Sequence, residues 1–543
     1  SGLSARRSGK RRKRDGSREW VNPSQLSRPD IVAFDADRAD FNGALAQFAI
    51  GLLQTTTPVE RSSQWRALFK EPPGAETLSE WFAPVRAAFE FDGDGARFMQ
   101  DLNLTADDGA FMEIAALLIE TPGENTLKNN ADHFVKRNAV KQLCMQCTAV
   151  ALFSLQLNAP SGGAGHRTGL RGGGPLTTLL LAPEGSSLWH HLWLNVIERE
   201  QFADEEASER TAPRFTFPWL ATIAAIQKEA GETAPVQTHP AHVFWAMPRR
   251  IRLSPSIKGV GQCDVCHREC DAMVTGYRTR NYGLNYKGPW NHPLSPYYEM
   301  NESWLPLHPQ PGGLGYRHWL AWVIGQTSER KKQRRARVVE HFLTNRTRTT
   351  SGALRLWAFG YDMDNMKARC WYESTLPLYD LGDTNPNSLE KVEAEVGRWL
   401  DSAEQVAFLL RGAVKDAWFK EAPARADFSA IDTAFWSGTE AAFYTQLRDL
   451  IGAVNNGAEL DITTVNNAWL GNLRRCANQL FTHQVVGAGP VEHRPRRIAL
   501  AHNRLQRSLN GPKLREALGL MVNEPESVAR KVARDGKSKG GEK

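Results

Sequence analysis

Apolar residues after position 387 recur at steps of three and four, the spacing that places side chains on one face of an α-helix. Four such stripes occur, separated by short polar or Pro- and Gly-containing connections, over 389–414, 443–454, 462–480 and 498–509. Amphipathic helices bury their apolar faces against one another, so this pattern predicts a four-helix bundle over 388–521.

The pattern ahead of residue 381 is mixed. The run FNGALAQFAIGLL at 41–53 suits a buried helix, whereas 240–300 carries Pro, Gly, aromatic residues and short β-like runs. Turn-forming residues gather in LGDTNPN at 381–387, which we interpret as a linker. The predicted fold class is therefore α+β, with a large mixed α/β domain over 19–380 followed by the bundle.

The composition is that of a folded globular protein. Of 543 residues, 41% are hydrophobic and 23% are charged, which excludes a wholly disordered chain, a collagen-like repeat and a disulfide scaffold. The sequence contains no run of about 18 apolar residues, so we expect no membrane span. It has no apolar core near its start, so we expect no signal peptide. The cysteine count, seven, is odd, and together with the lack of a secretory signal it favours a reducing compartment, so we expect a cytoplasmic protein.

The net charge of +7 is concentrated at one end of the chain. Residues 1–18 hold eight basic residues and one acid, so the remainder of the chain is neutral overall. Segments with so few apolar side chains cannot offset the entropy cost of ordering. We therefore expect residues 1–18 to be disordered and 522–543 to be a disordered basic tail. Contacts of the folded body with nucleic acid would then come from local patches.

Two CxxC pairs form the strongest local motif. The pairs Cys144/Cys147 and Cys263/Cys266 supply four thiolates, the donor set that structural Zn²⁺ takes in tetrahedral geometry. They are separated by 115 residues, so a shared metal would join distant segments. His267 and Cys270 are alternative ligands. The alternative to a metal site is that some of these cysteines are small buried side chains.

The most glycine-rich segment is SGGAGHRTGLRGGG at 161–174. It matches neither the P-loop pattern nor GxGxxG followed by a clear helix. Its glycines would let a ligand approach the backbone closely. Three basic side chains within it, those of His166, Arg167 and Arg171, could reach phosphates. A structural cluster of turns is the alternative that the sequence leaves open.

A basic run occupies 329–348, with eight basic residues against two acids. On a helix, Arg330, Arg334 and Arg337 would share a face, and this concentration within a neutral body favours contact with a polyanion. The alternative is a solvated helix face.

A third motif is the DxD of Asp362 and Asp364. Two carboxylates at that spacing can hold Mg²⁺, as in some nucleases. The motifs that accompany such chemistry in metalloproteases, α/β-hydrolases and kinases are absent from the sequence.

Several stretches together resemble CasA, the large subunit of the type I-E CRISPR surveillance complex Cascade. The matching stretches, in the family's order, are RFMQ (97–100), GENTLKNNADHFVKR (123–137), CMQCTAVALFSLQLNAPSGGAGHRTGLRGGGPLTT (144–178), PAHVFWAMPRRIRL (240–253), CDVC (263–266), WNHPLSPYY (290–298) and GYDMDNMKARCWY (360–372). The resemblance covers about residue 20 to about residue 521, and the predicted bundle fits the family's C-terminus. A basic run stands here where the family has its first strand, so we expect that strand to be absent or cut off.

The resemblance implies a recognition subunit and not an enzyme. CasA recognises the protospacer-adjacent motif (PAM) of double-stranded target DNA from the minor groove and helps to open the duplex, which leads to the R-loop. It also supports recruitment of the helicase-nuclease. Base pairing with the guide RNA reads the remaining sequence. The implied partners are the guide CRISPR RNA, double-stranded target DNA, the helicase-nuclease, and the backbone, small and 5′-handle-binding Cascade subunits, with no membrane. The implied location is the prokaryotic cytoplasm.

The family's DNA-contacting residues can be carried over by position. The glycine loop, whose small residues suit a narrow minor groove, falls on Ser161, Gly162, Gly163, Ala164 and Gly165, with Arg167 beside it. The wedge hairpin, which replaces a lost base step, falls on Asp364, Asn365 and Met366. A lysine that contacts the motif in some relatives lies near Asn281, which is flanked by Arg278 and Arg280.

The resemblance also implies an RNA contact. Phe134 matches the loop aromatic that anchors CasA to the 5′ handle of the guide RNA, and Lys136 and Arg137 lie beside it. Two other hypotheses stay open at this point. One is a metal-dependent nuclease that uses Asp362 and Asp364, and the other is an architectural RNA-binding scaffold.

Overall fold

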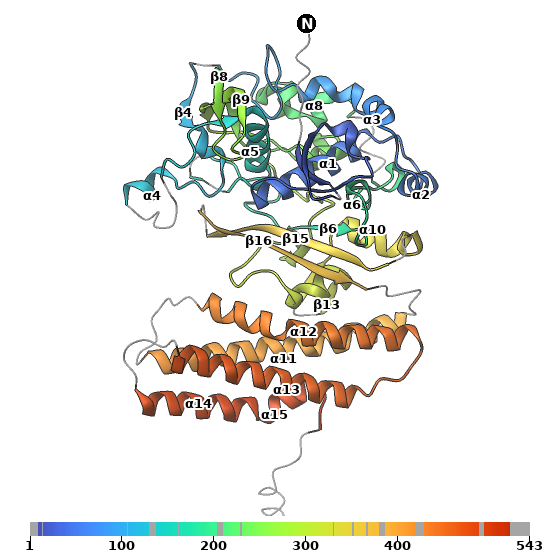
Figure 1. The fold of residues 1–543 in the computed structure, drawn as a ribbon, viewed down its shortest axis with the longest axis vertical. Helices are drawn as coiled ribbons and strands as arrows, with labels where there is room; N and C mark the ends of the chain where they lie inside the picture. The colour runs from blue at the N-terminus through green and yellow to red at the C-terminus, as the bar shows by residue number, and fades with distance from the viewer. Residues whose placement is uncertain are drawn as a thin grey trace, which may run out of the picture. The chain divides into compact units, whose positions relative to one another are not determined.

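The computed structural model describes residues 9–13, 15–105, 107–129, 137–160, 162–163, 165–202, 210–228, 231–328, 331–349, 352–364, 367–379, 386–419, 428–487 and 494–521. The chain forms two compact units, labelled by element in Figure 1: unit 1 comprises 1–314 and 321–380, and unit 2 comprises 315–320 and 381–543. Of the described helices, none has the length and apolar character needed to cross a lipid bilayer.

Unit 1 mixes short helices with short strands. Its helices are α1 (Ala39–Thr56), α2 (Ser62–Lys70), α3 (Ala75–Phe82), α4 (Glu124–Lys128), α5 (Met145–Asn158), α6 (Leu188–Trp193), α7 (Arg199–Phe202), α8 (Pro213–Thr216), α9 (Ile223–Ile226) and α10 (Arg337–Asn345). Its strands are β1 (Gly9–Lys13), β2 (Arg18–Val21), β3 (Ile31–Phe34), β4 (Ala110–Glu113), β5 (Leu143–Cys144), β6 (Thr177–Leu181), β7 (Arg250–Leu253), β8 (Ile257–Gln262), β9 (Glu269–Val274), β10 (Gly276–Arg280), β11 (Tyr297–Met300), β12 (Ser303–Pro306), β13 (Gln326–Ser328), β14 (Lys331–Arg334), β15 (Leu354–Asp364) and β16 (Lys367–Leu378).

The described strands form small antiparallel sheets with long crossovers. Their strand orders are β2-β1-β3, β4-β10-β7, β12-β11-β14-β13, β16-β15-β6 and β5-β9-β8. The longest pairing joins β15 to β16, from Leu354 opposite Leu378 to Asp364 opposite Lys367. Because many neighbours in these sheets are far apart in sequence, the sheets tie distant segments of unit 1 together.

The core of unit 1 is built around α1, which confirms the buried helix predicted over 41–53. The ring of Phe48 lies edge-on to four other aromatic rings, at centroid distances of 5.7 or 5.8 Å, those of Phe89, Phe98, Phe153 and Trp245. Aromatic side chains bury the largest apolar area per residue, so this cluster holds α1 against α5 and the segment before β7.

The N-terminal basic run contains a strand, so the expectation that all of 1–18 is disordered is wrong. Strand β1 pairs with β2 on one side and β3 on the other. Acidic residues pair with basic residues of this sheet: Lys13 of β1 with Glu19 at 2.6 Å, and Arg18 of β2 with Asp35 at 2.7 Å. Backbone pairing and these counter-charges offset the ordering cost that composition alone suggests. A first strand is therefore present, although its residues are basic.

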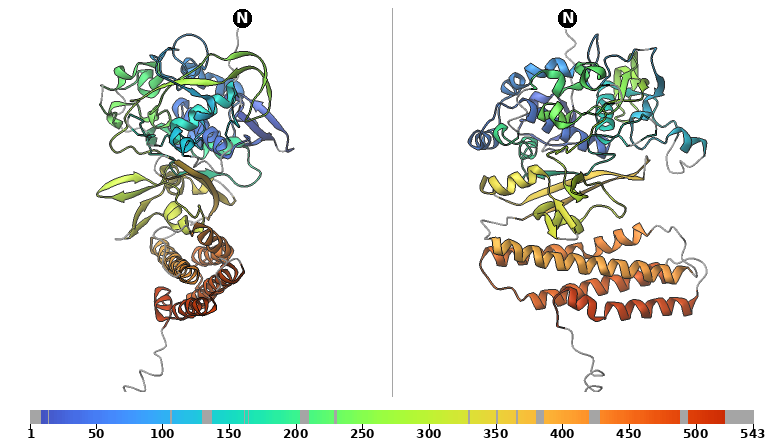
Figure 2. Two further views of the ribbon diagram at one scale, coloured as in Figure 1. Left: turned by 90° about the vertical axis from the view of Figure 1, so that its left-hand side faces the viewer. Right: turned by 180° about the vertical axis from the view of Figure 1, so that it is seen from behind.

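Unit 2 contains four long helices at the predicted stripes. They are α11 (Pro386–Trp418), α12 (Ser429–Asn455), α13 (Ile462–Phe481) and α14 (Pro495–Leu509), followed by the short α15 (Pro512–Ala517). The helices lie side by side in Figure 2, with α11 packed against α12, α13 and α14. The predicted stripe of α11 is buried from Val392 to Val414. Helix α11 begins at Pro386, inside the predicted linker 381–387, and 381–385 lie outside the described residues.

Residues 315–320 belong to unit 2, although the predicted boundary places them in the N-terminal domain. The Tyr316 ring stacks on Phe443 at 4.4 Å, and its hydroxyl bonds to the Thr439 hydroxyl at 2.8 Å. Trp319 is fully buried. The segment 315–320, from an earlier part of the chain, thus packs into the apolar core between the helices.

Candidate nucleic-acid interface and metal centre

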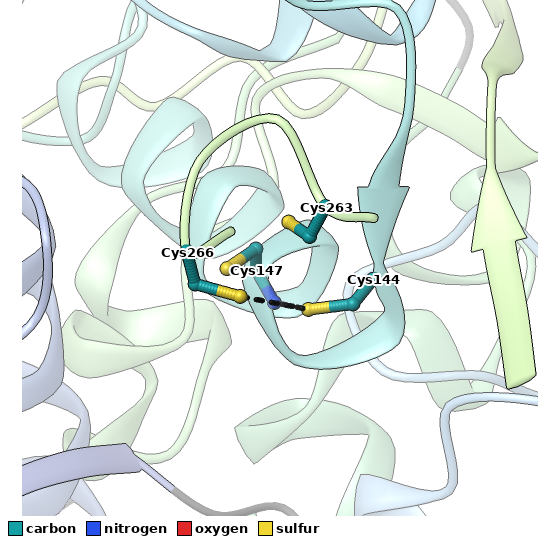
Figure 3. Close-up of side chains that lie close together, drawn as sticks. All are labelled: Cys144, Cys147, Cys263 and Cys266. Carbon is teal, nitrogen blue, oxygen red and sulfur yellow. Dashed lines mark hydrogen bonds between the residues drawn. The ribbon is translucent and has the colours of Figure 1, made fainter. Parts of the chain in front are cut away.

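The four predicted cysteine ligands lie together (Figure 3). Cys144 ends β5 and caps the N-terminus of α5, where its sulfur accepts a hydrogen bond from the Cys147 backbone N–H at 3.4 Å. Cys263 and Cys266 lie on the loop between β8 and β9. The four sulfur atoms all lie within 4.8 Å of one another, and those of Cys144 and Cys266 are 3.8 Å apart.

This geometry fits a tetrahedral metal. Zn–S bonds of about 2.3 Å put neighbouring sulfurs roughly 3.8 Å apart. Hydrogen bonding from the Cys144 thiol, with the other two thiols and burial, raises the pKa of Cys147. Four crowded thiols in such a site are favoured as thiolates only by a cation. The alternative ligands His267 and Cys270 are outside the cluster.

The glycine loop follows α5 directly. Gly163 and Gly165 have φ angles of +83° and +81°, in the left-handed region that favours glycine. Their surroundings differ: a Cβ on Gly163 would meet open space, whereas a Cβ on Gly165 would lie 2.6 Å from the Cβ of Asn281. Ser161 and Ala164 lie outside the described residues.

The structure brings the glycine loop and Asn281 together. The Tyr282 backbone N–H donates to the Gly165 carbonyl at 2.8 Å, and the Arg167 guanidinium lies 5.6 Å from the centre of the Tyr282 ring. Tyr282 is exposed and has a φ of +62°, a strained value for a residue with a side chain. Two segments more than 100 residues apart in sequence thus form one exposed edge.

The other end of the glycine segment packs under the hairpin of β15 and β16. A Cβ on Gly174 would lie 2.7 Å from the Tyr361 carbonyl oxygen, and one on Gly360 would lie 2.6 Å from that of Pro175. The segment 160–176 therefore links the edge at 281–282 to the strands that carry the predicted wedge. Asp364 ends β15 and is exposed, whereas Asn365 and Met366 lie outside the described residues.

The DxD does not form a metal site within the described residues. Asp362 is buried and accepts two hydrogen bonds from Arg369, at 2.6 and 3.1 Å. In the described part of the chain, the cysteine cluster is the only group of three or more metal-binding side chains close enough to share an ion. The geometry gives no support to the nuclease hypothesis.

Arg278 and Arg280 on β10 are engaged within the protein. Arg280 pairs with Asp108 at 2.8 Å, and Arg278 lies 5.6 Å from the centre of the Phe111 ring on β4. Of the predicted RNA-binding residues, Arg137 is exposed and donates to the Leu127 carbonyl at 3.3 Å. Phe134 and Lys136 lie outside the described residues.

The basic run at 329–348 is not one helix, so the predicted shared face of Arg330, Arg334 and Arg337 is wrong. Residues 331–334 pair with β11 and β13 as strand β14, and α10 begins only at Arg337. Arg334 lies between the Tyr297 and Trp304 rings, at 4.8 and 4.7 Å from their centres. Arg330 lies outside the described residues. Long-range pairing, which no helical periodicity records, decides this segment.

Two residues at this interface were not predicted from the sequence. Arg249 bonds to both ends of the glycine loop, and Tyr282 packs against it. Arg249 lies within PAHVFWAMPRRIRL and Tyr282 follows Asn281, so proximity to predicted positions was the available signal. An arginine at 249 or a tyrosine at 282 does not by itself indicate a contact with the glycine loop.

The chain matches one protein family along most of its length. A family model described as CRISPR-associated protein Cse1 (CRISPR_cse1) matches residues 10–480. Among solved structures, Thermobifida fusca Cse1 is similar with a TM-score of 0.65 and 15% identity, covering 95% of this chain and 97% of that one.

Two further structures share the fold. CasA of Thermus thermophilus gives a TM-score of 0.64 and 16% identity, covering 92% of this chain and 97% of its own. A chain from a structure described as a CRISPR RNA-guided surveillance complex gives 0.59 and 16%, covering 93% and 98%. Identities this low establish a shared fold.

Proposed function

Because the chain belongs to the CRISPR-associated protein Cse1 family, also named CasA, we propose that it is the large subunit of a type I-E CRISPR surveillance complex, Cascade. In this role it recognises the PAM of double-stranded target DNA from the minor groove. The observation that carries this proposal is the contact of the glycine loop with Asn281 and Tyr282, which forms one exposed edge from small residues and polar tips.

The composition of this edge supports minor-groove recognition. A loop of glycines can enter a groove that is about 6 Å wide, because no side chains separate its backbone from the base edges. Backbone N–H groups and the Asn281 amide are suited to the acceptors that every base pair presents there. Arg167, next to the loop, is placed for a phosphate or for the groove itself.

Duplex opening is assigned to the hairpin of β15 and β16. Its tip carries the proposed wedge of Asp364, Asn365 and Met366. Near this tip, Asp362 of β15 and Arg369 of β16 form an ion pair at 2.6 Å, which links the two strands. Unstacking one base step costs a few kcal/mol, which an inserted side chain partly offsets.

The remaining roles follow the same assignment. The chain is a recognition subunit and not an enzyme. Phe134, Lys136 and Arg137 contact the 5′ handle of the guide RNA beside the backbone, small and 5′-handle-binding subunits. The long helices of unit 2 form a four-helix bundle, and the chain supports recruitment of the helicase-nuclease to opened target DNA.

The cysteine centre is proposed to hold structural Zn²⁺. Cys144, Cys147, Cys263 and Cys266 would hold the ion, which supplies a tetrahedral cross-link between the start of α5 and the β8–β9 loop. Cys144 caps α5, and the glycine loop leaves the other end of this helix. Strands β9 and β10 lead from Cys266 to Asn281. Both halves of the proposed DNA-binding edge are therefore connected to this centre by regular elements.

The proposal is tested with the reconstituted complex in mobility-shift assays against a library of motif variants, at one stated salt concentration. Gly163→Asp should weaken binding of motif-bearing duplex at least tenfold, because a carboxylate would enter the groove beside the bases. Gly185→Asp is the matched control, since Gly185 is also exposed, has a φ of +84° and has open space around it.

Asn365→Ala separates opening from recognition. Its defect should shrink on a duplex that is already unpaired next to the motif, because the wedge is then not needed. The Gly163→Asp defect should persist on the same DNA. Wild-type binding of motif duplex by both variants, in an assembled complex, would contradict the proposal.

A further inference from the structure

We propose that Arg249 is a positioning residue that holds the glycine loop in its DNA-binding shape, and that its bond to His166 makes this shape dependent on pH. This inference rests on the proposed function, because it concerns the loop that reads the motif. Neither residue is assigned a DNA contact: both act through the backbone that they fix.

The Arg249 guanidinium spans the two ends of the loop. One terminal nitrogen donates to the Pro160 carbonyl, where the chain leaves α5, and the other bonds to Nδ1 of His166. Between these ends, the His166 backbone N–H donates to the Gly163 carbonyl at 3.2 Å. A single planar group thus fixes the distance between Pro160 and His166, which are six positions apart in sequence.

Arg249 is itself held by α5. The buried Gln156 side chain donates to the Arg249 carbonyl at 2.9 Å and accepts from its backbone N–H at 2.9 Å. This pair of bonds fixes the backbone from which the guanidinium extends. The loop is therefore supported from its own helix through Gln156, as a functional loop must be if it is to keep one conformation.

The charge of Arg249 is not neutralised by the described residues around it. Burial lowers the pKa of Arg249 to about 10, and no described carboxylate pairs with it. The nearby acid Asp101 is bound to Arg250, at 2.5 Å. Burying a cation without a counter-ion is unfavourable for folding. The hydrogen bonds from Arg249 to the loop offset part of this cost.

His166 must be neutral for this arrangement to exist. A guanidinium has donors and no acceptor, so Nδ1 of His166 is the acceptor and carries no proton. The other titratable groups near the pair are Arg167 on the loop itself, Tyr282 just after β10, and the buried Tyr277 of β10, which interacts with the Arg249 charge. Among the described residues, no acid contacts the imidazole. Burial and the Arg249 charge lower the pKa of His166.

Protonation of His166 therefore breaks its bond to Arg249. At pH 7 and above, His166 is neutral and the bond is made. As the pH falls through the lowered pKa of His166, the acceptor is lost and two cations face each other. The loop then has to be ordered by DNA at the moment of binding, and that ordering entropy weakens motif recognition.

The test uses the assembled complex and compares motif duplex with a motif-scrambled duplex between pH 5.5 and pH 8. Arg249→Met should weaken motif binding about tenfold at pH 7.5 and reduce discrimination between the duplexes. Arg249→Lys should be intermediate, because one ammonium cannot donate in both directions with the same geometry. Thermal unfolding and complex assembly show whether each variant is folded.

His166→Asn supplies the discriminating readout. The Asn carbonyl oxygen replaces Nδ1 as an acceptor and does not titrate, so motif binding should stay near that of the wild type at pH 7.5. It should lose little as the pH falls through the lowered pKa of His166, where the wild type loses several-fold. An acid loss equal to that of the wild type would overturn the proposal, as would wild-type motif binding by Arg249→Met while Gly163→Asp is defective. If Gly163→Asp also binds normally, the proposed function itself fails.

Discussion

Gly165 and Asn281 lie so close together that a methyl group added to Gly165 would push Asn281 away. Alanine at Gly165 would place a Cβ 2.6 Å from the Asn281 Cβ, whereas alanine at Gly163 would meet nothing within 4 Å. Both glycines have nearly the same positive φ, so both substitutions carry the same backbone strain of about 1–2 kcal/mol. The pair therefore isolates the effect of contact between the loop and residue 281.

We expect Gly165→Ala to weaken motif-duplex binding several-fold more than Gly163→Ala. The reason is that displacing Asn281 and Tyr282 breaks the proposed DNA-binding edge, at a cost comparable to that of one mismatched base pair, about 1–3 kcal/mol. Titration of labelled motif duplex with the assembled complex measures both. Equal losses would show that strain alone, and not the contact, sets the effect.

A second residue-scale prediction concerns stability. Glu198 and Arg346 are a buried ion pair, with side chains 2% and 1% exposed, and Arg346 also lies 3.7 Å from the centre of the Trp65 ring. Arg346→Met should destabilise the chain by about 3–5 kcal/mol, because Glu198 would remain as a buried charge without its main partner. Arg61→Met, which breaks the exposed pair with Glu200, should cost no more than about 1 kcal/mol. Chemical denaturation of both variants measures the difference.

The same pair gives a pH dependence with a defined sign. Burial opposes ionisation of Glu198, but the hydrogen bond from His341 and the charge of Arg346 outweigh it and lower the pKa of Glu198. A carboxyl group whose pKa is lower in the folded chain stabilises it above the unfolded value of about 4.3. This stabilisation is lost as the pH falls through the lowered value. Glu198→Gln should therefore flatten the acid limb of a stability profile, and an unchanged limb would contradict this.

At the scale of elements, α5 connects the cysteine centre to the glycine loop. It begins at Met145, capped by Cys144, and ends at Asn158, directly before the loop. The glycine loop and the β8–β9 loop are rich in turns and polar residues, so their positions depend on the ends of this helix and on β9 and β10. The cysteine centre is thus part of what aligns the proposed DNA-binding edge.

Metal removal should affect this region before it affects unit 2. We expect about one zinc ion per chain by elemental analysis. Chelation or Cys263→Ser should raise hydrogen exchange in 257–282 and at the start of α5, with little change in α11. Cys476→Ser, a cysteine outside the cluster, is the matched control. A metal content far below one, or uniform unfolding of the chain, would count against this role.

At the scale of the whole molecule, charge is divided between the helices of unit 2. Helices α11 and α12 carry nine acidic and five basic residues, whereas α13, α14 and α15 carry eight basic residues and one acid. The chain outside 1–18 is neutral overall, but the last three helices of unit 2 are strongly basic. Helices with such an excess of basic residues attract nucleic acid without sequence preference.

Replacing Arg475, Arg496 and Arg507 with Gln should weaken binding of non-specific DNA and reduce its salt dependence. Each lost phosphate contact lowers the slope of log K against log salt by about 0.9. The matched triple, Lys391, Arg398 and Lys415 to Gln on α11, should change the slope little, because acids already neutralise that helix. Filter binding across a salt series compares them, and equal slopes for the two triples would contradict the assignment to α13–α15.

The sequence by itself determined the parts of this protein that local chemistry encodes. Helical stripes such as that of α11 were predicted because a buried helix face repeats every three to four residues. The four cysteines were predicted to share one site because a CxxC pair already has the spacing of two metal ligands, and the structure brings both pairs together. The glycine loop and Asn281 were marked by resemblance, and only the structure shows that they are neighbours.

Only the tertiary structure decided the features that depend on distant partners. The basic β1 is a strand because two neighbours pair with it, 331–334 is a strand because β11 and β13 flank it, and 315–320 joins unit 2 because Tyr316 fits between its helices. Arg249 controls the glycine loop from 83 residues away from His166. Contacts across such separations produce no periodic pattern in the sequence, because the chemistry of one residue does not determine which distant residue will pack against it or bind it.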